Sequence, residues 1–404
     1  MNYIIRSEKF HREIKTENHA MYCPVFCEIM PPFIYKSIIE NGNEQQRNVA
    51  MAALASSDRF RTIREMAGTQ VVGARFSTLL ISAEPEKDRT IYDAHNTPAI
   101  GTIVRHEGEP KTGDVAADEA YDYAGATYDF YKDVFGRNSI DNNGLKLDST
   151  VHFRESEDEP FENAAWADGR MWYGDGDPER SNRFTIDLAI IGHELSHGVV
   201  QYEGGLKYQK DTGAINEHFA DVFGILVKQY KLKESAEELN WLMGEGIWKE
   251  NIVNGKAIRS MKEPGTAFGP DPVIGKDPQP AHMSNYVDFG TCVSARQCDY
   301  GGVHINSGIL NKAFYNTAIE IGGNAWEAPG QIWYTALVNL PNNPDKTTFE
   351  DLANTTIAEA GKIFGNDSKE QKAVHKAWKD VGIKVTSGNA ASFLLSKGVR
   401  KIRH

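Results

Sequence analysis

The chain has 404 residues and a mass of 45.0 kDa, a length that predicts two or three domains with cores of their own. Its 40% hydrophobic and 25% charged residues exclude a disordered chain or a fibrous repeat. The formal charge of −12 argues against nucleic acid or an anionic membrane as a partner. No apolar run reaches the roughly 18 residues that span a bilayer.

The N-terminal segment is interrupted by charges every few residues and lacks the apolar core of a Sec signal peptide. We therefore expect synthesis in the cytoplasm, with export, if any, by a non-classical route. Four cysteines fall in two close pairs, Cys23 with Cys27 and Cys292 with Cys298. Each pair could be a disulfide, a metal site or two thiols, and reduced thiols are the default in that compartment.

Changes in residue pattern divide the chain into four segments, 1–69, 70–185, 186–384 and 385–404. The first contains a Pro-Pro pair and is rich in strong helix formers. The last is a short basic stretch, to which we assign no role.

The two middle segments differ in the period of their apolar residues. The second segment holds short β-type runs, such as 71–82 and 149–153, around one helix candidate at 118–136. The third has apolar residues at helical spacing over 185–202, 213–231, 303–322 and 331–340. A β-rich region followed by a helical one predicts an α+β fold.

A five-residue motif, HELSH, has the spacing of metal ligands. His193 and His197 lie at positions i and i+4, which share one face of a helix, so both imidazoles can reach one metal ion. Glu194 lies about 100° around the axis, beside the ligands, where it can reach a water on the metal. The alternative is a helix whose two histidines only form hydrogen bonds.

A third ligand is needed, because catalytic zinc usually takes three protein ligands and keeps one position for water. The next helical segment offers Glu217 and Asp221, again at i and i+4. One carboxylate can bind the metal while the other accepts the second ring N–H of a ligand histidine. Metzincins would have Gly and His where Val200 and Glu203 stand, which excludes that class.

These residues and the intervals between them resemble the active-site block of the thermolysin family of zinc metalloproteases. The resemblance runs from about residue 92 to 384 and includes the segments 162–177, 257–261 and 299–315. It implies a two-lobed fold, with a β-rich N-terminal lobe, a helical C-terminal lobe and the zinc site in the cleft between them. It also implies one catalytic zinc ion and hydrolysis of peptide or protein substrates.

Roles around the metal follow from this resemblance. It implies His193, His197 and Glu217 as the zinc ligands and Asp221 as the partner of His193. Glu194 would be the base that activates the zinc-bound water.

Charge that develops on the peptide oxygen needs hydrogen-bond donors. The positions that match the family's donors are Tyr208 and His304. Asp299 would orient His304 and favour its protonated form.

Substrate binding is implied by two further motifs. The residues that would hold the substrate backbone are Asn163, Ala164 and Arg259. The family prefers a bulky hydrophobic residue after the scissile bond, and Ile190 and Ile258 would keep that pocket apolar.

The chain departs from the family at its double calcium site. Two positions that supply carboxylates in the family are Ala189 and Lys228 here. Neither can act as a carboxylate ligand, and Lys228 adds a positive charge. We expect the double site to be reduced or absent, with Glu245 left as an isolated ligand.

The first segment resembles the short propeptides of the protealysin subgroup, through Pro31-Pro32 followed by Phe33. A Pro-Pro stretch can lie in a substrate cleft without presenting backbone N–H groups, so we expect residues 1–69 to inhibit the protease until they are removed. An accessory helical module is one alternative. A thiolate of Cys23 or Cys27 on the zinc is another route to inhibition.

The leading prediction is therefore a zinc endopeptidase made as an inactive precursor. The alternative is a non-catalytic peptide-binding protein that keeps the metalloprotease fold. Intact Glu194, Tyr208 and His304 weigh against this alternative, because a protein without activity has no need of a catalytic base.

Overall fold

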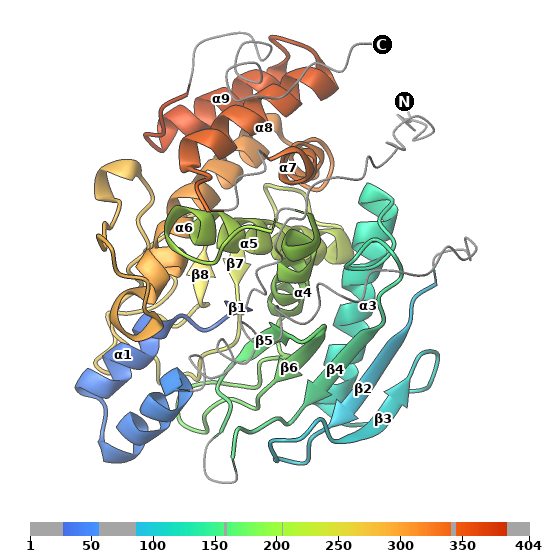
Figure 1. The fold of residues 1–404 in the computed structure, drawn as a ribbon, viewed down its shortest axis with the longest axis vertical. Coiled ribbons are helices and arrows are strands. Elements are labelled where there is room, and N and C mark those ends of the chain that lie inside the picture. Colours follow the sequence, from blue (N-terminus) through green and yellow to red (C-terminus); the bar gives the residue numbers. More distant parts are fainter. Residues whose placement is uncertain (1–26, 56–85, 157–159, 204, 341–344, 386–404) are drawn as a thin grey trace.

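A six-stranded sheet and a layer of helices make up the part of the chain that the computed structural model describes, residues 27–55, 86–156, 160–203, 205–340 and 345–385 (Figure 1). Several expectations fall outside these residues: the β-type run at 71–82, the boundary near residue 69, the thiol of Cys23 and nearly all of the basic stretch at 385–404.

The sheet has the strand order β1-β5-β6-β4-β2-β3. Its strands are β1 (Cys27–Glu28), β2 (Arg89–Asp93), β3 (Thr102–His106), β4 (Leu147–Val151), β5 (Ala164–Ala167) and β6 (Arg170–Tyr173). β4 pairs in parallel with β2 and β6, and the other pairs are antiparallel. The two-residue strand β1, from the N-terminal segment, therefore covers the edge of the sheet along β5.

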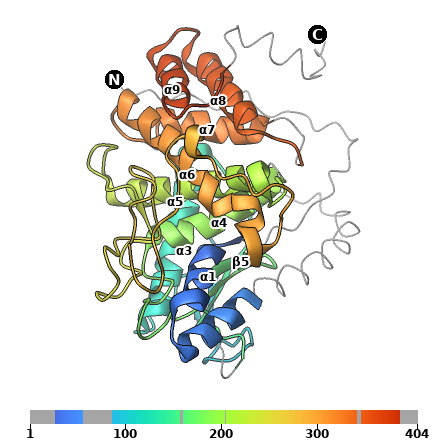
Figure 2. The same ribbon diagram turned by 90° about the vertical axis from the view of Figure 1, so that its left-hand side faces the viewer.

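Helices form the rest of the core and extend away from the sheet (Figure 2). The labelled helices are α1 (Pro32–Asn41), α3 (Val115–Phe135), α4 (Leu188–Glu203), α5 (Lys210–Leu232), α6 (Ala295–Ile321), α7 (Ala328–Asn339), α8 (Phe349–Phe364) and α9 (Lys369–Asp380), and residues 44–55 are helical as well. A small hairpin, β7 (Leu242–Met243) with β8 (Arg259–Ser260), and a 3-10 turn at Met283–Asn285 lie between α5 and α6. The expected α+β class is confirmed.

No helix in the described part of the chain is long and apolar enough to cross a bilayer. Helix α3 packs against β2 and β4, and α4 packs against β5 on one side and α5 on the other. The sheet edge and the two helices therefore meet around one line, where β5, α4 and α5 come together.

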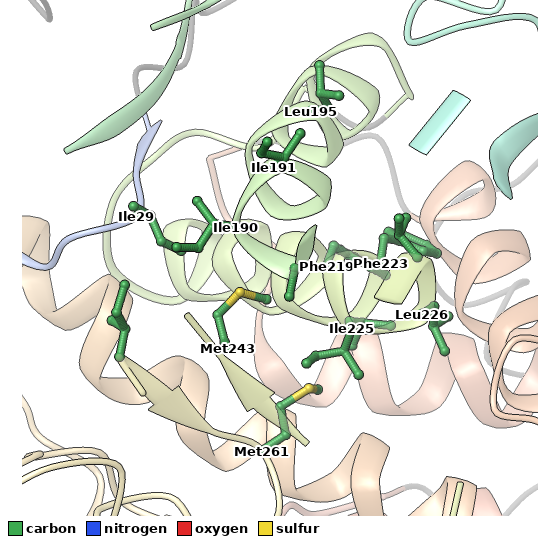
Figure 3. Packing of buried hydrophobic residues seen from close by; sticks show 14 of the residues in the cluster. Ile29, Ile190, Ile191, Leu195, Phe219, Phe223, Ile225, Leu226, Met243 and Met261 are labelled. Carbon is green, nitrogen blue, oxygen red and sulfur yellow. The ribbon is translucent and has the colours of Figure 1, made fainter. Parts of the chain in front are cut away.

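Two glycines let α4 and α5 approach closely. A Cβ atom on Gly192 would lie 3.1 Å from the Gly224 Cα, and one on Gly224 would lie 2.6 Å from the carbonyl oxygen of Ala189. Larger residues would hold the helices apart. The apolar side chains buried in the surrounding core include Ile190, Leu195, Phe219 and Phe223 (Figure 3).

One ion-pair network joins the sheet to the start of α3. His152, just after β4, has Nδ1 2.8 Å from Asp175 Oδ1 and Nε2 3.1 Å from Asp114 Oδ2. Asp114 also caps α3 by accepting from the Ala117 N–H. The hydrogen bond and charge of Asp175, together with Asp114, outweigh partial burial and raise the pKa of His152 to about 9.

This network predicts a pH-dependent contribution to stability. The folded-state pKa of His152 exceeds its unfolded value, so the contribution is complete below about pH 6.5 and is lost as the pH rises through about 9. We expect His152→Gln to lower the free energy of unfolding by about 1 kcal/mol at pH 6, after screening, and by much less at pH 10. Urea unfolding at both pH values measures this, with exposed His106→Gln as the control. An equal loss at both values would contradict it.

Candidate metal centre and active site

Three buried side chains from α4 and α5 converge on one point. His193 and His197 share one face of α4, and their Nε2 atoms are 2.9 Å apart. Glu217 of α5 lies opposite, with Oε1 3.3 Å from His197 Nε2 and Oε2 3.7 Å from His193 Nε2. The three ligand atoms all lie within 4.8 Å of one another, as the sequence predicted for a metal site.

Outer contacts fix the direction in which both imidazoles face. His193 Nδ1 lies 2.8 Å from Asp221 Oδ1, and His197 Nδ1 lies 2.8 Å from Asn216 Oδ1. Because both partners are acceptors, Nδ1 carries the proton in each ring, and the Nε2 lone pairs point toward Glu217. Burial and the neighbouring His197 lower the pKa of His193 to about 4, so that ring is neutral.

The donor set fits a zinc ion. Two imidazole nitrogens and a carboxylate are the ligands that a catalytic zinc site uses. Glu217 Oε2 is buried and has no hydrogen-bond partner among the described residues, as a carboxylate oxygen kept for a metal would. Sequence reasoning missed Asn216. Its position next to Glu217 was the available signal.

Asp221 is held by three other side chains. Arg259 donates to it from Nε at 2.9 Å and from Nη2 at 2.7 Å, and Asn311 donates from Nδ2 at 2.8 Å. Burial opposes ionisation, yet Arg259 and His193 keep the pKa of Asp221 below its usual range. Asp221 therefore stays ionised in the core and can orient His193.

Glu194 lies beside the His193–His197–Glu217 cluster and is fully buried. Its Oε2 accepts from the backbone N–H of Trp166 in β5 at 3.0 Å, and its Oε1 has no hydrogen-bond partner among the described residues. Burial, and then the charge of Glu217, raise the pKa of Glu194 well above its usual range. A carboxylate in this setting has a strong tendency to take up a proton.

Tyr208 and His304 reach the same centre from the other side. The Tyr208 hydroxyl donates to Glu217 Oε1 and lies 3.1 Å from His304 Nε2. Asp299 accepts from both the ring Nδ1 and the backbone N–H of His304. Burial alone would lower the pKa of His304, but Asp299 and Glu217 raise it to about 9. The sequence-predicted residues are thus brought together.

The turn that carries Asp299 interrupts α6. Asp299 and Tyr300 have φ values of 51° and 53°, in the left-handed region, and the two following glycines do so as well. Directly before the turn, Cys292 and Cys298 form a disulfide with Cα atoms 6.2 Å apart. The structure therefore selects the disulfide among the three states that the spacing allowed for this pair. The pairing of Cys23 and the side chain of Cys27 are outside the described residues.

The N-terminal segment lies along the edge of β5 where the sequence predicts substrate binding. β1 pairs with β5, and the next two residues continue along it. The Ile29 N–H donates to the Ala164 carbonyl at 3.3 Å, and the Met30 N–H donates to Asn163 Oδ1 at 2.9 Å.

Two backbone carbonyls of this segment also meet predicted site residues. Arg259 Nη1 donates to the Ile29 carbonyl at 3.0 Å, and His304 Nε2 lies 3.1 Å from the Glu28 carbonyl oxygen. A carbonyl oxygen only accepts, so His304 Nε2 is the donor. Arg259 thus contacts both the bound backbone and Asp221, a double contact that the sequence did not indicate.

The Pro-Pro pair does not itself make these contacts, contrary to our expectation. Pro31 and Pro32 are buried at the start of α1, where Pro32 occupies the first turn and Phe33 is half-buried. Proline suits this position, because a first-turn residue has no intrahelical partner for its N–H. Residues 28–30 lie in the site instead, and they present backbone N–H groups to it.

Comparisons with known proteins agree with this geometry. Residues 79–201 match the family model of the thermolysin metallopeptidase catalytic domain, and residues 204–383 match that of its alpha-helical domain. Protease PrtS of Photorhabdus sp. (strain Az29) is 44% identical over 361 residues, 88% of this chain and 92% of that protein. The extracellular metalloprotease of Pectobacterium carotovorum subsp. carotovorum is 40% identical over 373 residues, 89% and 97% of the two chains.

A solved structure is also similar, the precursor of protealysin, a metalloproteinase from Serratia proteamaculans. It has 42% identity and a TM-score of 0.76, and the match covers 89% of this chain and 100% of that one. The Pectobacterium relative is named an extracellular protease. This name contradicts our expectation of cytoplasmic synthesis with export, if any, by a non-classical route. The chain belongs to the thermolysin family of metalloendopeptidases and is a zymogen-type, protealysin-like member.

Proposed function

We propose that this chain is a secreted zinc endopeptidase precursor in which His193, His197 and Glu217 hold one zinc ion. The observation that carries this proposal is the buried His-His-Glu cluster, with both outer ring nitrogens fixed and Glu194 beside it. The ion would act as a Lewis acid on water and on the peptide carbonyl. A disulfide in the described chain agrees with an oxidising, extracellular setting.

The protein's own residues would then divide the proton transfers. Glu194 takes a proton from the attacking water and passes it to the departing amine, a task that suits a buried carboxylate with a raised pKa. His304, positively charged and held by Asp299, donates to the carbonyl oxygen as negative charge develops there, and Tyr208 lies next to it. Asn163, Ala164 and Arg259 hold the substrate backbone along β5.

A bulky hydrophobic residue after the scissile bond is the preferred substrate feature. The support comes from Ile29, whose carbonyl receives the Arg259 hydrogen bond and whose side chain is fully buried in the same apolar cluster as Ile190 (Figure 3). Ile258 belongs to the same buried cluster. Burial of a large apolar side chain in a pocket of this kind contributes about 1.5–3 kcal/mol to the free energy of binding.

Residues 1 to about 69 act as an inhibitory propeptide. The support is steric, because residues 27–30 occupy the edge of β5 and contact Arg259 and His304. Helix α1 fixes this segment, since the Tyr35 hydroxyl donates to the Glu162 carbonyl at 2.8 Å and the Ser37 hydroxyl donates to the Val273 carbonyl at 2.9 Å. The catalytic lobes would then be 70–185 and 186–384.

Metal removal tests the proposed function. We expect mature protein to cut casein and a furylacryloyl dipeptide amide, to lose at least about 99% of this activity in phenanthroline, and to regain it with added zinc, because the three ligands hold only one essential ion. Metal analysis should give one zinc per chain. Activity that survives complete zinc removal would refute the mechanism.

We further propose that Lys228 replaces a calcium ion of the family's double site. Its ammonium lies 2.9 Å from Glu245 Oε2 and 3.2 Å from Asp187 Oδ1. Burial opposes the charge, but Asp187 and Glu245 raise the pKa of Lys228. The other oxygen of Asp187 accepts from two backbone N–H groups, and Ala189 supplies no carboxylate.

This arrangement predicts stability without calcium. A chelator selective for calcium, with zinc kept saturating, should change the melting temperature by less than about 2 °C, because no ligand-binding energy is lost. Differential scanning calorimetry measures this, and thermolysin under the same conditions is the positive control. A large fall in melting temperature in this protein would mean that a calcium site persists.

A further inference from the structure

We infer that the Glu28–Ile29 peptide bond of the precursor is itself a substrate bond, which the protein cuts within its own chain, and that the cut segment stays bound. This inference rests on the proposed function and extends it to the precursor's own backbone. According to this inference, the first cleavage of the chain does not activate the protease.

The contacts around this bond are those of a bound substrate on both sides. Before the bond, the Glu28 carbonyl oxygen accepts from His304 Nε2 at 3.1 Å. After it, the Ile29 N–H donates to the Ala164 carbonyl at 3.3 Å and the Ile29 carbonyl accepts from Arg259 at 3.0 Å. Cys27 and Glu28 pair antiparallel with β5, and the chain bends at Ile29 and Met30.

The register of the segment selects one bond. Among the carbonyls of the described N-terminal segment, the oxygen that meets His304 is that of Glu28, and His304 is the donor placed for a developing oxyanion. The next residue, Ile29, buries its whole side chain in the apolar cluster that also holds Ile190 (Figure 3), which matches a preference for a bulky apolar residue after the bond. The bond that meets both conditions is Glu28–Ile29.

The reaction is an ordinary hydrolysis with water as co-reactant. The bond between the Glu28 carbonyl carbon and the Ile29 nitrogen breaks, the carbon gains the water oxygen, and Ile29 gains a proton to become a free amine. Glu194 carries the proton, and its Oε1 has no other hydrogen-bond partner among the described residues. No oxidant or other reactant is required.

Cutting this bond does not release the segment that follows it. Residues after the cut remain part of the same chain as the catalytic lobes, and α1 stays anchored by the buried Ile34, Tyr35 and Ile38. The Arg259 and Asn163 contacts lie after the cut and are kept. The new N-terminus at Ile29 therefore continues to fill the site, at the high effective concentration of a tethered ligand.

The first test follows cleavage in the zinc-loaded, full-length precursor. We expect intact-mass analysis and N-terminal sequencing to find a new N-terminus, Ile-Met-Pro-Pro, at a rate that does not change over a 100-fold dilution. Glu194→Gln should give no cut. Ile29→Asp should slow it by about 100-fold, because a charge is placed in an apolar pocket, whereas the matched Ile29→Leu should still be cut.

A second test does not depend on activity. In zinc-free Glu194→Gln precursor, the amide hydrogens of Ile29 and Met30 should be protected from solvent exchange, and Ile29→Asp should remove this protection. Protein that is cut at this bond should remain inhibited toward the furylacryloyl dipeptide amide until the segment from Ile29 onward is removed.

The outcomes distinguish this inference from the proposed function. Mature protein that is active, with a precursor that is never cut at Glu28–Ile29 or is cut only at a concentration-dependent rate, would overturn the inference alone. Activity that appears in step with this cut would overturn the claim that the segment stays bound. Mature protein without zinc-dependent activity would refute both.

Discussion

Glu194→Gln should reduce kcat of the mature protein by about 10²–10⁴-fold, because it removes the proton acceptor of the reaction. Zinc content should stay at one per chain, since Glu194 lies outside the His193–His197–Glu217 cluster. The fold should not weaken. A glutamine side chain can still accept from the Trp166 N–H. The substitution also replaces a buried carboxylate whose Oε1 has no hydrogen-bond partner among the described residues.

Steady-state kinetics, metal analysis and thermal unfolding on the same preparation check this prediction. The contrasting variant is Glu217→Gln, which should lose activity together with zinc, because it weakens a ligand and leaves the base in place. If Glu194→Gln lost its zinc as well, Glu194 would be a ligand and the assigned roles would be wrong.

Asp221→Ala should be the most destabilising single change around the site. Asp221 lies between Arg259 and His193, and all three side chains are buried. Removing one partner of a buried ion pair leaves the other charge uncompensated and costs about 3–5 kcal/mol. Loss of the contact to His193 Nδ1 should weaken zinc binding by about 10–100-fold as well.

Urea unfolding of the metal-free protein and zinc competition titrations separate these two effects. The control is Glu320→Ala, which removes a half-exposed carboxylate paired with Lys376 at 3.3 Å and should cost less than about 1 kcal/mol. Equal effects of the two substitutions would show that the Asp221 network does not support the site.

The periodicity of the sequence predicted much of the site because the relevant spacing is local. His193 and His197 share a face of α4 through their separation of four residues, and Glu217 and Asp221 do so on α5. Helical apolar patterns also located both helices to within about three residues at each end. The α+β class followed from the same patterns.

Contacts between segments far apart in the sequence were harder to predict. We predicted the inhibitory motif at the Pro-Pro pair. The residues that contact Arg259 and His304 are Ile29 and Glu28, whose sequence has no recognisable motif. Backbone pairing to a sheet edge depends on register and not on residue type. The contact of Asn216 with His197 was missed for a related reason. Which side chain an amide on a helix contacts depends on how the helices pack.

The sequence by itself determined which side chains could bind a metal, since four-residue spacing on a helix is a property of a single segment. Tertiary structure alone decided that the two helices approach closely enough, through Gly192 and Gly224, for Glu217 to complete the cluster. It also decided that residues 28–30 lie along β5 with one peptide bond at the centre of the site. Both outcomes depend on contacts between segments far apart in the chain. The spacing of residues within one segment does not determine such contacts.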